Sequence, residues 1–210
     1  MENHARPSAG IYNYGVLSGF GDGDDETIGA GLDRATSGLR RQGLEFDVIV
    51  MSLGCYTLDD EPPPLDQYLR ELIRPDTLVV AAAGNAGSPR PQWPAALPNV
   101  VAVGALASDG RAWFSNYGGW VDACAPGVDV RSTFFGTDDS PVADKIDDDL
   151  VNEFRGWAAW SGTSFTAPKV AAVIADEARR LGISAHEAWK LLSHHDHFRY
   201  PDLGVVFNVV

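Results

Sequence analysis

Thr77-Leu-Val-Val-Ala-Ala-Ala-Gly-Asn85 is a stretch in which every residue from 78 to 83 is apolar, and it ends in a turn-forming Gly-Asn pair. Residues 46–51 and 100–106 form two further, nearly continuous apolar runs of strand length. Strands that are apolar on both faces and separated by helices are typical of a parallel sheet covered on both sides. The three runs therefore predict an α/β fold.

Helical periodicity connects and follows these runs. Apolar residues recur every three to four positions over residues 27–41, with acidic residues at the start, and a short helix is expected over residues 65–73. A third apolar stripe follows Ala167 and ends at Gly182, a typical helix stop. We also expect a strand over residues 120–125 and a surface insertion over the acidic residues 137–153.

The composition excludes several classes of partner. The chain has 210 residues with 45% apolar content, which suits one substantial core, so we expect one domain over residues 1–210. A net charge of −13 argues against nucleic acid and anionic membranes, because such partners require clustered Lys and Arg. The chain contains no run of about 18 apolar residues and begins without the features of a secretory signal. Neither localisation nor oligomeric state follows from the sequence.

Two cysteines, Cys55 and Cys124, are too few to define a disulfide framework. Both lie in strand-like surroundings, where a free cysteine usually behaves as a small buried hydrophobic residue. We therefore expect two buried thiols rather than a disulfide.

Ser164 lies in the run Gly162-Thr-Ser-Phe-Thr-Ala-Pro168, directly before the third helical stripe. At a helix N-terminus, unpaired backbone N–H groups and the positive end of the helix dipole favour developing negative charge. Pro168 is expected in the first turn, where its missing N–H has little effect. These features suit an activated nucleophile, and the competing interpretation is that Ser164 or Thr163 is only a helix N-cap.

Two strand ends carry residues that suit such a site. Asn85 follows the strand over residues 77–83, at the edge where open α/β sheets place their ligands, and its amide can donate to an oxyanion. Gly54 follows the strand over residues 46–51, where the absence of a side chain lets another backbone approach and pair. The simpler alternatives are that Asn85 and Gly84 only form a left-handed turn and that Gly54 only ends a strand.

Several segments, taken in order, resemble the subtilisin-like serine peptidases, the subtilase family. Residues 48–54 are similar to its substrate-binding strand, and residues 79–85 are similar to the strand that ends in its oxyanion-hole Asn. The run from Gly162 to Pro168 resembles its nucleophile signature, although Phe165-Thr166 replaces the usual Met-Ala. Further similar segments are residues 93–105, 114–118 and 125–127. The resemblance covers nearly the whole chain.

Two other groups of serine hydrolases fit less well. The sedolisin group shares the Gly-Thr-Ser nucleophile and the following Pro, but it uses an acidic oxyanion residue where this chain has Asn85. The nucleophile elbow of an α/β-hydrolase requires a second Gly at the position of Thr166.

The resemblance implies a subtilisin-like three-layer fold, with a mainly parallel sheet between helices, and a serine endopeptidase that acts on polypeptides. It implies Ser164 as the nucleophile, and Asn85 with the Ser164 N–H as the oxyanion hole. The residues that it assigns to substrate binding, by pairing with the peptide backbone or by lining the pocket before the scissile bond, are Ser52, Leu53, Gly54, Ala83 and Gly84.

The triad Asp and His of the family precede its substrate-binding strand, in an Asp-Ser/Thr-Gly turn and a His-Gly-Thr helix start. Neither motif occurs in this chain. The resemblance therefore implies the C-terminal two-thirds of a catalytic domain, incomplete at its N-terminus, which lacks the first strands and the His helix and is nearly inactive alone. The alternative is a catalytically inactive relative that binds extended peptides.

No histidine of the chain suits the role of the missing base. His4 is followed by Ala-Arg-Pro rather than by Gly-Thr. His186 lies between Ser184 and Glu187, which form a capping-box pattern typical of an exposed helix start. The His-His-Asp-His cluster over residues 194–197 lacks regular metal-ligand spacing and suits a solvated helix end.

We expect no cofactor. Many subtilases bind calcium, but neither residues 22–26 nor residues 147–149 have the alternating acidic spacing of a known calcium loop. Solvated loops are the favoured interpretation of both acidic stretches.

Overall fold

A mainly parallel sheet organises the computed structural model, which describes residues 9–134, 156–194 and 198–209. The helices are α1 (Asp25–Arg40), α2 (Leu65–Leu72), α4 (Thr163–Leu181) and α5 (Ala185–Leu192). The strands are β1 (Val48–Met51), β2 (Leu78–Ala82), β3 (Val100–Ala107), β4 (Gly110–Arg111), β5 (Ala123–Pro126), β6 (Val130–Thr133), β7 (Trp157–Trp160), β8 (Arg199–Tyr200) and β9 (Gly204–Val206).

The strand order of the main sheet is β1-β2-β3-β5-β9-β8. All neighbours from β1 to β9 are parallel, whereas β8 pairs with β9 and β4 pairs with β3 in the antiparallel sense. A separate antiparallel pair consists of β6 and β7. Because β1, β2 and β3 run in the same direction, their carboxyl ends lie at one edge of the sheet.

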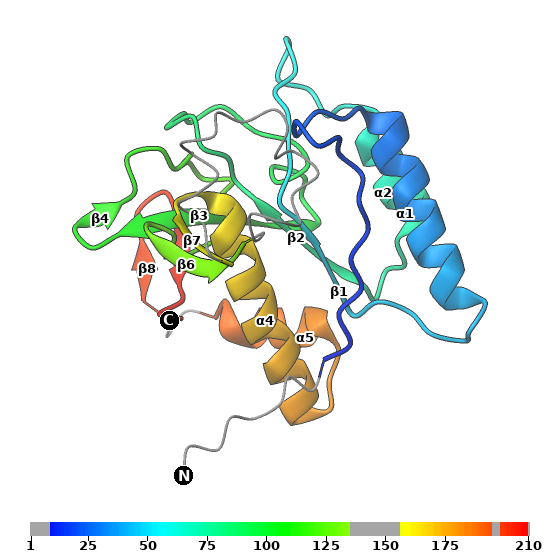
Figure 1. Cartoon of the computed structure of the whole chain (residues 1–210). Helices are drawn as coiled ribbons and strands as arrows, with labels where there is room; N and C mark the ends of the chain where they lie inside the picture. Colours follow the sequence, from blue (N-terminus) through cyan, green and yellow to red (C-terminus); the bar gives the residue numbers. More distant parts are fainter. Residues whose placement is uncertain (1–8, 135–155, 195–197, 210) are drawn as a thin grey trace.

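Helices cover both faces of the sheet (Figure 1). Every residue of β2 is buried. Val80 and its alternate neighbours pack with Ile174 of α4, while Val79 and Ala81 pack in the cluster that includes Leu32 of α1 and residues of α2. Each buried Val or Leu side chain contributes about 1.5–3 kcal/mol. The α/β fold with a mainly parallel sheet between helices, predicted from the apolar runs, is confirmed.

The helices are amphipathic rather than apolar all round. α1 buries Leu32 and exposes Asp33, and α4 buries Ile174 and exposes Arg180. Within the ranges that the structure describes, no helix combines the length and the apolar character that a bilayer crossing requires.

α1 begins at Asp25 rather than at Thr27, because Asp24 caps its N-terminus. The Asp24 carboxylate accepts a hydrogen bond of 2.7 Å from the Thr27 N–H. This bond lowers the pKa of Asp24 below its usual value. Residues 22–24 form an exposed loop, as predicted for this acidic stretch, whereas Asp25 and Glu26 belong to the first turn of α1.

α4 begins at Thr163, ahead of the apolar stripe, so Pro168 lies in its second turn rather than in its first. The N-cap is Gly162 and no side chain caps this end. The interpretation of Ser164 or Thr163 as an N-cap is therefore wrong. The predicted helix stop is confirmed, because Gly182 has a left-handed φ of 67° that favours glycine.

β5 begins at Ala123, later than the predicted strand over residues 120–125. The preceding backbone is used in a turn, in which the Val121 N–H donates to the Gly118 carbonyl at 3.0 Å. The predicted surface insertion over residues 137–153 lies outside the described residues.

Both cysteines are free, as predicted, but only one of them is buried. Cys124 lies inside β5 and has no exposed surface. Cys55 is exposed, because it follows β1 in a surface segment whose backbone forms an isolated bridge with Trp93. The expectation of a second buried thiol is wrong for Cys55.

Candidate active site

Three segments meet at the carboxyl edge of the sheet and enclose a hollow of about 180 Å³. They are the ends of β1 and β2 and the N-terminus of α4, with Gln92 added from the loop before β3. The lining residues are Ser52, Leu53, Gly54, Ala82, Gly84, Asn85, Gln92, Thr163 and Ser164. All the residues predicted for the site line this hollow except Ala83, whose side chain is fully buried in a cluster with Val121 and Cys124.

Ser164 is half-buried and is the second residue of α4. Its hydroxyl oxygen lies 3.5 Å from the Ser52 carbonyl oxygen, at the limit of a weak hydrogen bond. Its backbone N–H donates to no acceptor within the described part of the chain, as is typical of a first helical turn. Ser164 therefore combines a hydroxyl at the hollow with an unpaired N–H and the positive end of a helix dipole.

The side chain of Asn85 is held by Thr163, the residue before Ser164. Asn85 Oδ1 accepts hydrogen bonds from the Thr163 N–H at 2.8 Å and from the Thr163 hydroxyl at 2.9 Å. A backbone N–H can only donate, so the oxygen of the carboxamide must face Thr163 and Nδ2 must lie on the other side. Asn85 is exposed, and Nδ2 has no acceptor among the described residues. This amide can therefore donate to a ligand.

Thr163 links the turn after β2 to the start of α4. Its side chain is fully buried, and its hydroxyl accepts from the Gly84 N–H at 3.1 Å while donating to Asn85. Gly84 has a φ of 104°, which favours glycine, and a Cβ there would collide with Gln92 and Asn116. Both the conformation and the close contacts explain why the turn needs glycine at this position.

Asn116 holds the same turn from its other side and is fully buried. Its Oδ1 accepts from the N–H groups of Ala86 and Ser88, each at 3.1 Å. Its Nδ2 donates to the Ala83 carbonyl at 2.8 Å. The hydrogen bonds of one buried carboxamide thus span the turn that presents Asn85.

Sequence reasoning missed the parts that Thr163, Gln92 and Asn116 have in this arrangement. Thr163 and Asn116 lie inside segments that resemble subtilases, so the sequence marked their positions. It did not indicate which groups they would hydrogen-bond. Gln92 lies in a Pro-rich loop without periodicity, and nothing in the sequence indicates that it reaches the hollow.

The residues around the hollow include no histidine and no charged side chain. His186 lies in α5, where Ser184 and Glu187 form the predicted capping box. His194 follows α5, and the other histidines lie outside the described residues. The residues that the structure describes contain no group of three or more His, Cys, Asp or Glu side chains that could hold a metal ion. A proton acceptor for Ser164 therefore does not come from the residues that line the hollow.

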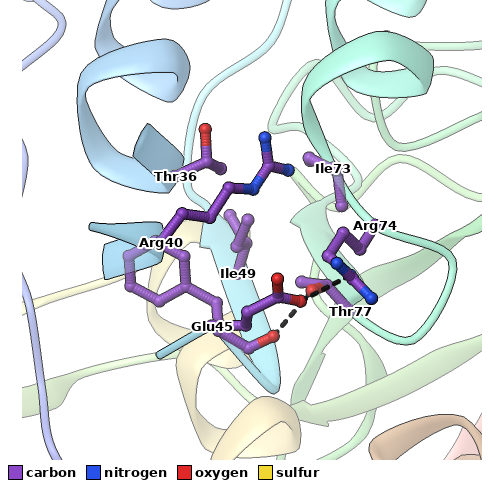
Figure 2. Close-up of a pocket in the computed structure, with 8 residues that line it drawn as sticks. Thr36, Arg40, Glu45, Ile49, Ile73, Arg74 and Thr77 are labelled. Atoms are coloured by element: carbon purple, nitrogen blue, oxygen red, sulfur yellow. Dashed lines mark hydrogen bonds and ion pairs between the residues drawn. The ribbon is translucent and has the colours of Figure 1, made fainter. Parts of the chain in front are cut away.

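A second, smaller hollow lies between the end of α1, β1 and the loop before β2 (Figure 2). Its volume is about 10 Å³, which is room for a single water molecule. Arg74 pairs with Glu45 at 2.6 Å, and Arg40 donates to the Leu72 carbonyl at 2.7 Å. Since its charged groups already have partners, this hollow is a weaker candidate for a site than the one at Ser164.

Comparisons of the sequence with known proteins agree on one family. The sequence profile of the subtilase family matches residues 2–192. The thermophilic serine proteinase of Bacillus sp. (strain AK1) is 40% identical over 130 residues, which cover 61% of this chain and 27% of that protein. Subtilisin Savinase of Lederbergia lenta is 34% identical over 173 residues, which cover 80% of this chain and 53% of that protein.

Solved structures give the same result for the fold. A cold adapted subtilisin-like serine proteinase matches with a TM-score of 0.69 at 27% identity, covering 93% of this chain and 65% of that one. The prenylagaramide maturation protease PagA matches with a TM-score of 0.61 at 25% identity, covering 81% of this chain and 57% of that one. The subtilisin-like fold predicted from the resemblance is confirmed. The chain spans 27% to 65% of the lengths of these four proteins.

Proposed function

The chain belongs to the subtilase family, and on this basis we propose that it contributes the nucleophile and the oxyanion hole of a serine endopeptidase site. The observation that carries the proposal is the hydrogen bond from the Thr163 N–H to Asn85 Oδ1. It supports the proposal because it turns Asn85 Nδ2 away from Thr163 and leaves it unpaired. Asn85 and Ser164, whose N–H is also unpaired among the described residues, line the same hollow.

In the proposed reaction, Ser164 Oγ attacks the carbonyl carbon of a peptide bond, and its proton passes to a general base. The carbonyl electrons move onto the oxygen, where Asn85 Nδ2 and the Ser164 N–H donate to the negative charge. Collapse of the tetrahedral intermediate breaks the C–N bond, and the leaving amine takes the proton from the base. Water then hydrolyses the acyl ester on Ser164 by the reverse proton transfers.

The general base is the component that the lining residues do not supply. We propose that the chain alone is nearly inactive, because losing the serine or the histidine of such a triad lowers turnover by about 10⁶ in subtilisin, a relative and not this chain. Residual acceleration then comes from the oxyanion hole and from substrate binding. No metal or cofactor takes part in the proposed reaction.

The end of β1 supports an extended polypeptide as the substrate. β1 has β2 on one side and no strand on the other within the described residues. Ser52 and Gly54, which follow β1, are exposed. A peptide that lies along this edge can pair through main-chain hydrogen bonds, which act largely independently of its side chains.

A fluorophosphonate probe, which forms a covalent bond with activated serines, tests this proposal. We expect slow labelling confined to Ser164, identified by peptide mass spectrometry, and faster labelling when imidazole is added as an exogenous base. Ser164→Ala should abolish the labelling, while Ser161→Ala, a matched change in the same segment, should leave it. Labelling that falls on other serines would contradict the nucleophile assignment. Rapid labelling without imidazole would show that the chain supplies its own base.

A second candidate function is peptide binding without cleavage, and the absence of a base among the lining residues favours it. In that case the edge after β1 binds extended peptides, and Ser164 has no chemical role. This alternative predicts equal peptide affinity for the wild type and Ser164→Ala, together with labelling that does not respond to imidazole. Imidazole-dependent labelling of Ser164 decides for the peptidase.

A further inference from the structure

Gln92 lies between the two strand ends that line the hollow. Its Nε2 lies close to Gly54 and its Oε1 lies close to Gly84, since a Cβ at either glycine would collide with these atoms. The next residue, Trp93, makes two backbone hydrogen bonds of 2.9 Å with Cys55, which fix this loop against the end of β1. The side chain of Gln92 thus occupies the space between the segments on which a substrate would lie.

The orientation of the Gln92 amide follows from that of Asn116. Asn116 Oδ1 faces the N–H groups of Ala86 and Ser88, which can only donate. The amide of Asn116 therefore cannot be reversed, and its Nδ2 is the atom that faces Gln92 at 3.1 Å. This Nδ2 also donates to the Tyr56 hydroxyl at 2.7 Å and to the Ala83 carbonyl at 2.8 Å, so its two hydrogens have nearer acceptors than Gln92. An amide nitrogen of Gln92 in the same place would still face it donor to donor, so Gln92 turns Oε1 toward Asn116 and Nε2 toward Gly54.

This arrangement leaves a hydrogen-bond donor at the hollow. Gln92 is half-buried, and its Nε2 has no acceptor among the described residues. An unpaired donor that loses its water on binding weakens a complex, whereas a donor that finds an acceptor does not carry this penalty. Side chains that bring an oxygen to Nε2 are therefore favoured over side chains that cannot accept.

We propose that Gln92 determines the specificity of this site, by selecting an acceptor oxygen in the substrate side chain before the scissile bond. The substrate class is an extended peptide with a carboxamide or carboxylate side chain at this position, such as Gln or Glu. Lys and Arg carry only donors and are rejected. The inference rests on the proposed function, because it requires a peptide along Ser52–Gly54.

Fluorescence anisotropy of labelled product-like peptides, fluorescein-Ala-Ala-Pro-X with a free carboxylate, tests this selection on the 210-residue chain. X is Gln, Met or Lys, of which Met matches Gln in length without an acceptor oxygen. We expect the wild type to bind the Gln peptide about tenfold more tightly than the Met peptide, the size of one satisfied donor, and the Lys peptide most weakly.

Gln92→Glu keeps an acceptor for Asn116 but replaces the free donor by an acceptor with a negative charge. It should reverse the ranking, so that the Lys peptide binds most tightly. Gln92→Met should remove the preference for Gln over Met. Gln42→Glu, the same change at an exposed position after α1, should leave the wild-type ranking unchanged. Thermal melts verify that each variant is folded.

The outcomes separate this inference from the proposed function. A ranking that is the same in the wild type, Gln92→Glu and Gln92→Met would overturn the role of Gln92 and leave the peptide site intact. Failure of every peptide to bind the folded wild type would overturn the proposed function together with the inference. A peptide ranking that reverses in Gln92→Glu but not in Gln42→Glu supports both the role of Gln92 and the proposed function.

Discussion

The Ser52 hydroxyl donates a hydrogen bond of 3.0 Å to the carbonyl oxygen of Ser164. In a regular helix this carbonyl would accept from the N–H four residues later, but that residue is Pro168, which has no N–H. Ser52 therefore satisfies the carbonyl that the proline leaves unpaired. The bond ties the end of β1, where the peptide is proposed to lie, to the residue proposed as nucleophile.

A double-mutant cycle tests this compensation. Ser52→Ala should lower the free energy of unfolding by about 1 kcal/mol, because it leaves the Ser164 carbonyl without a protein donor. In a Pro168→Ala background, the helix regains its own N–H donor and the same change should have a smaller effect. Denaturant melts of the four proteins measure both values. An equal effect of Ser52→Ala in the two backgrounds would contradict the compensation.

Thr163→Val should destabilise the chain by about 1–3 kcal/mol, although it preserves the size of the side chain. It removes the hydroxyl that accepts from the Gly84 N–H and donates to Asn85, which leaves a buried N–H unpaired. Thr163→Ser is the matched control, because it keeps the hydroxyl and loses only a methyl group. Urea melts measure the difference, and a Val variant as stable as the Ser variant would rule out the network as a stabilising element.

The two thiols should react at very different rates. Burial raises the pKa of Cys124 to about 12, and its side chain has no exposed surface. Cys55 is exposed, although partial burial and nearby Asp25 raise its pKa above the usual value. We expect maleimide to modify Cys55 alone in the folded chain and both residues in guanidinium, as read by mass spectrometry. As a control, the folded Cys55→Ser variant should not react with maleimide. Rapid modification of Cys124 in the folded chain would contradict the buried position of β5.

Asp122 should make the stability depend on pH. Burial raises its pKa, even though the Ala102 N–H donates to its carboxylate at 2.9 Å. The native state then binds this proton more tightly than the unfolded chain, whose Asp pKa is about 3.9. Its contribution to stability is therefore full below about pH 4 and is lost as the pH rises through the raised native pKa.

Asp122→Asn keeps an acceptor for Ala102 and removes the charge. We expect a higher Tm than the wild type at pH 7, and a gain that shrinks toward pH 4. Thermal melts between these pH values measure it, with Asp109→Asn as an exposed control. A gain that is independent of pH would indicate that desolvation of the Asp122 carboxylate is not its cause.

The sequence predicted the sheet and its helices because their apolar periodicity depends on local spacing. The predicted ends of the helices were less accurate where a side-chain hydrogen bond sets them, as that of Asp24 does for α1. Ser164, Asn85 and Gly54 could be found because they follow recognisable strands or precede a helix. Gln92 could not, because its position depends on the backbone bridge between Trp93 and Cys55, which is remote in sequence. Ser52 itself was predicted, but its hydrogen bond to Ser164 was not, because the two residues lie 112 positions apart in the sequence.

The most direct test of the central claim, that Asn85 and Ser164 act on the same oxyanion, is the rate of fluorophosphonate labelling at Ser164 in Asn85→Asp. This variant keeps the acceptor that Thr163 holds but replaces the Nδ2 donor by an oxygen. We predict labelling of Ser164 that is slower than in the wild type by about 10²–10³, the effect of losing an oxyanion donor in subtilisin, a relative. Equal rates in two folded proteins, measured with imidazole present, would contradict the claim.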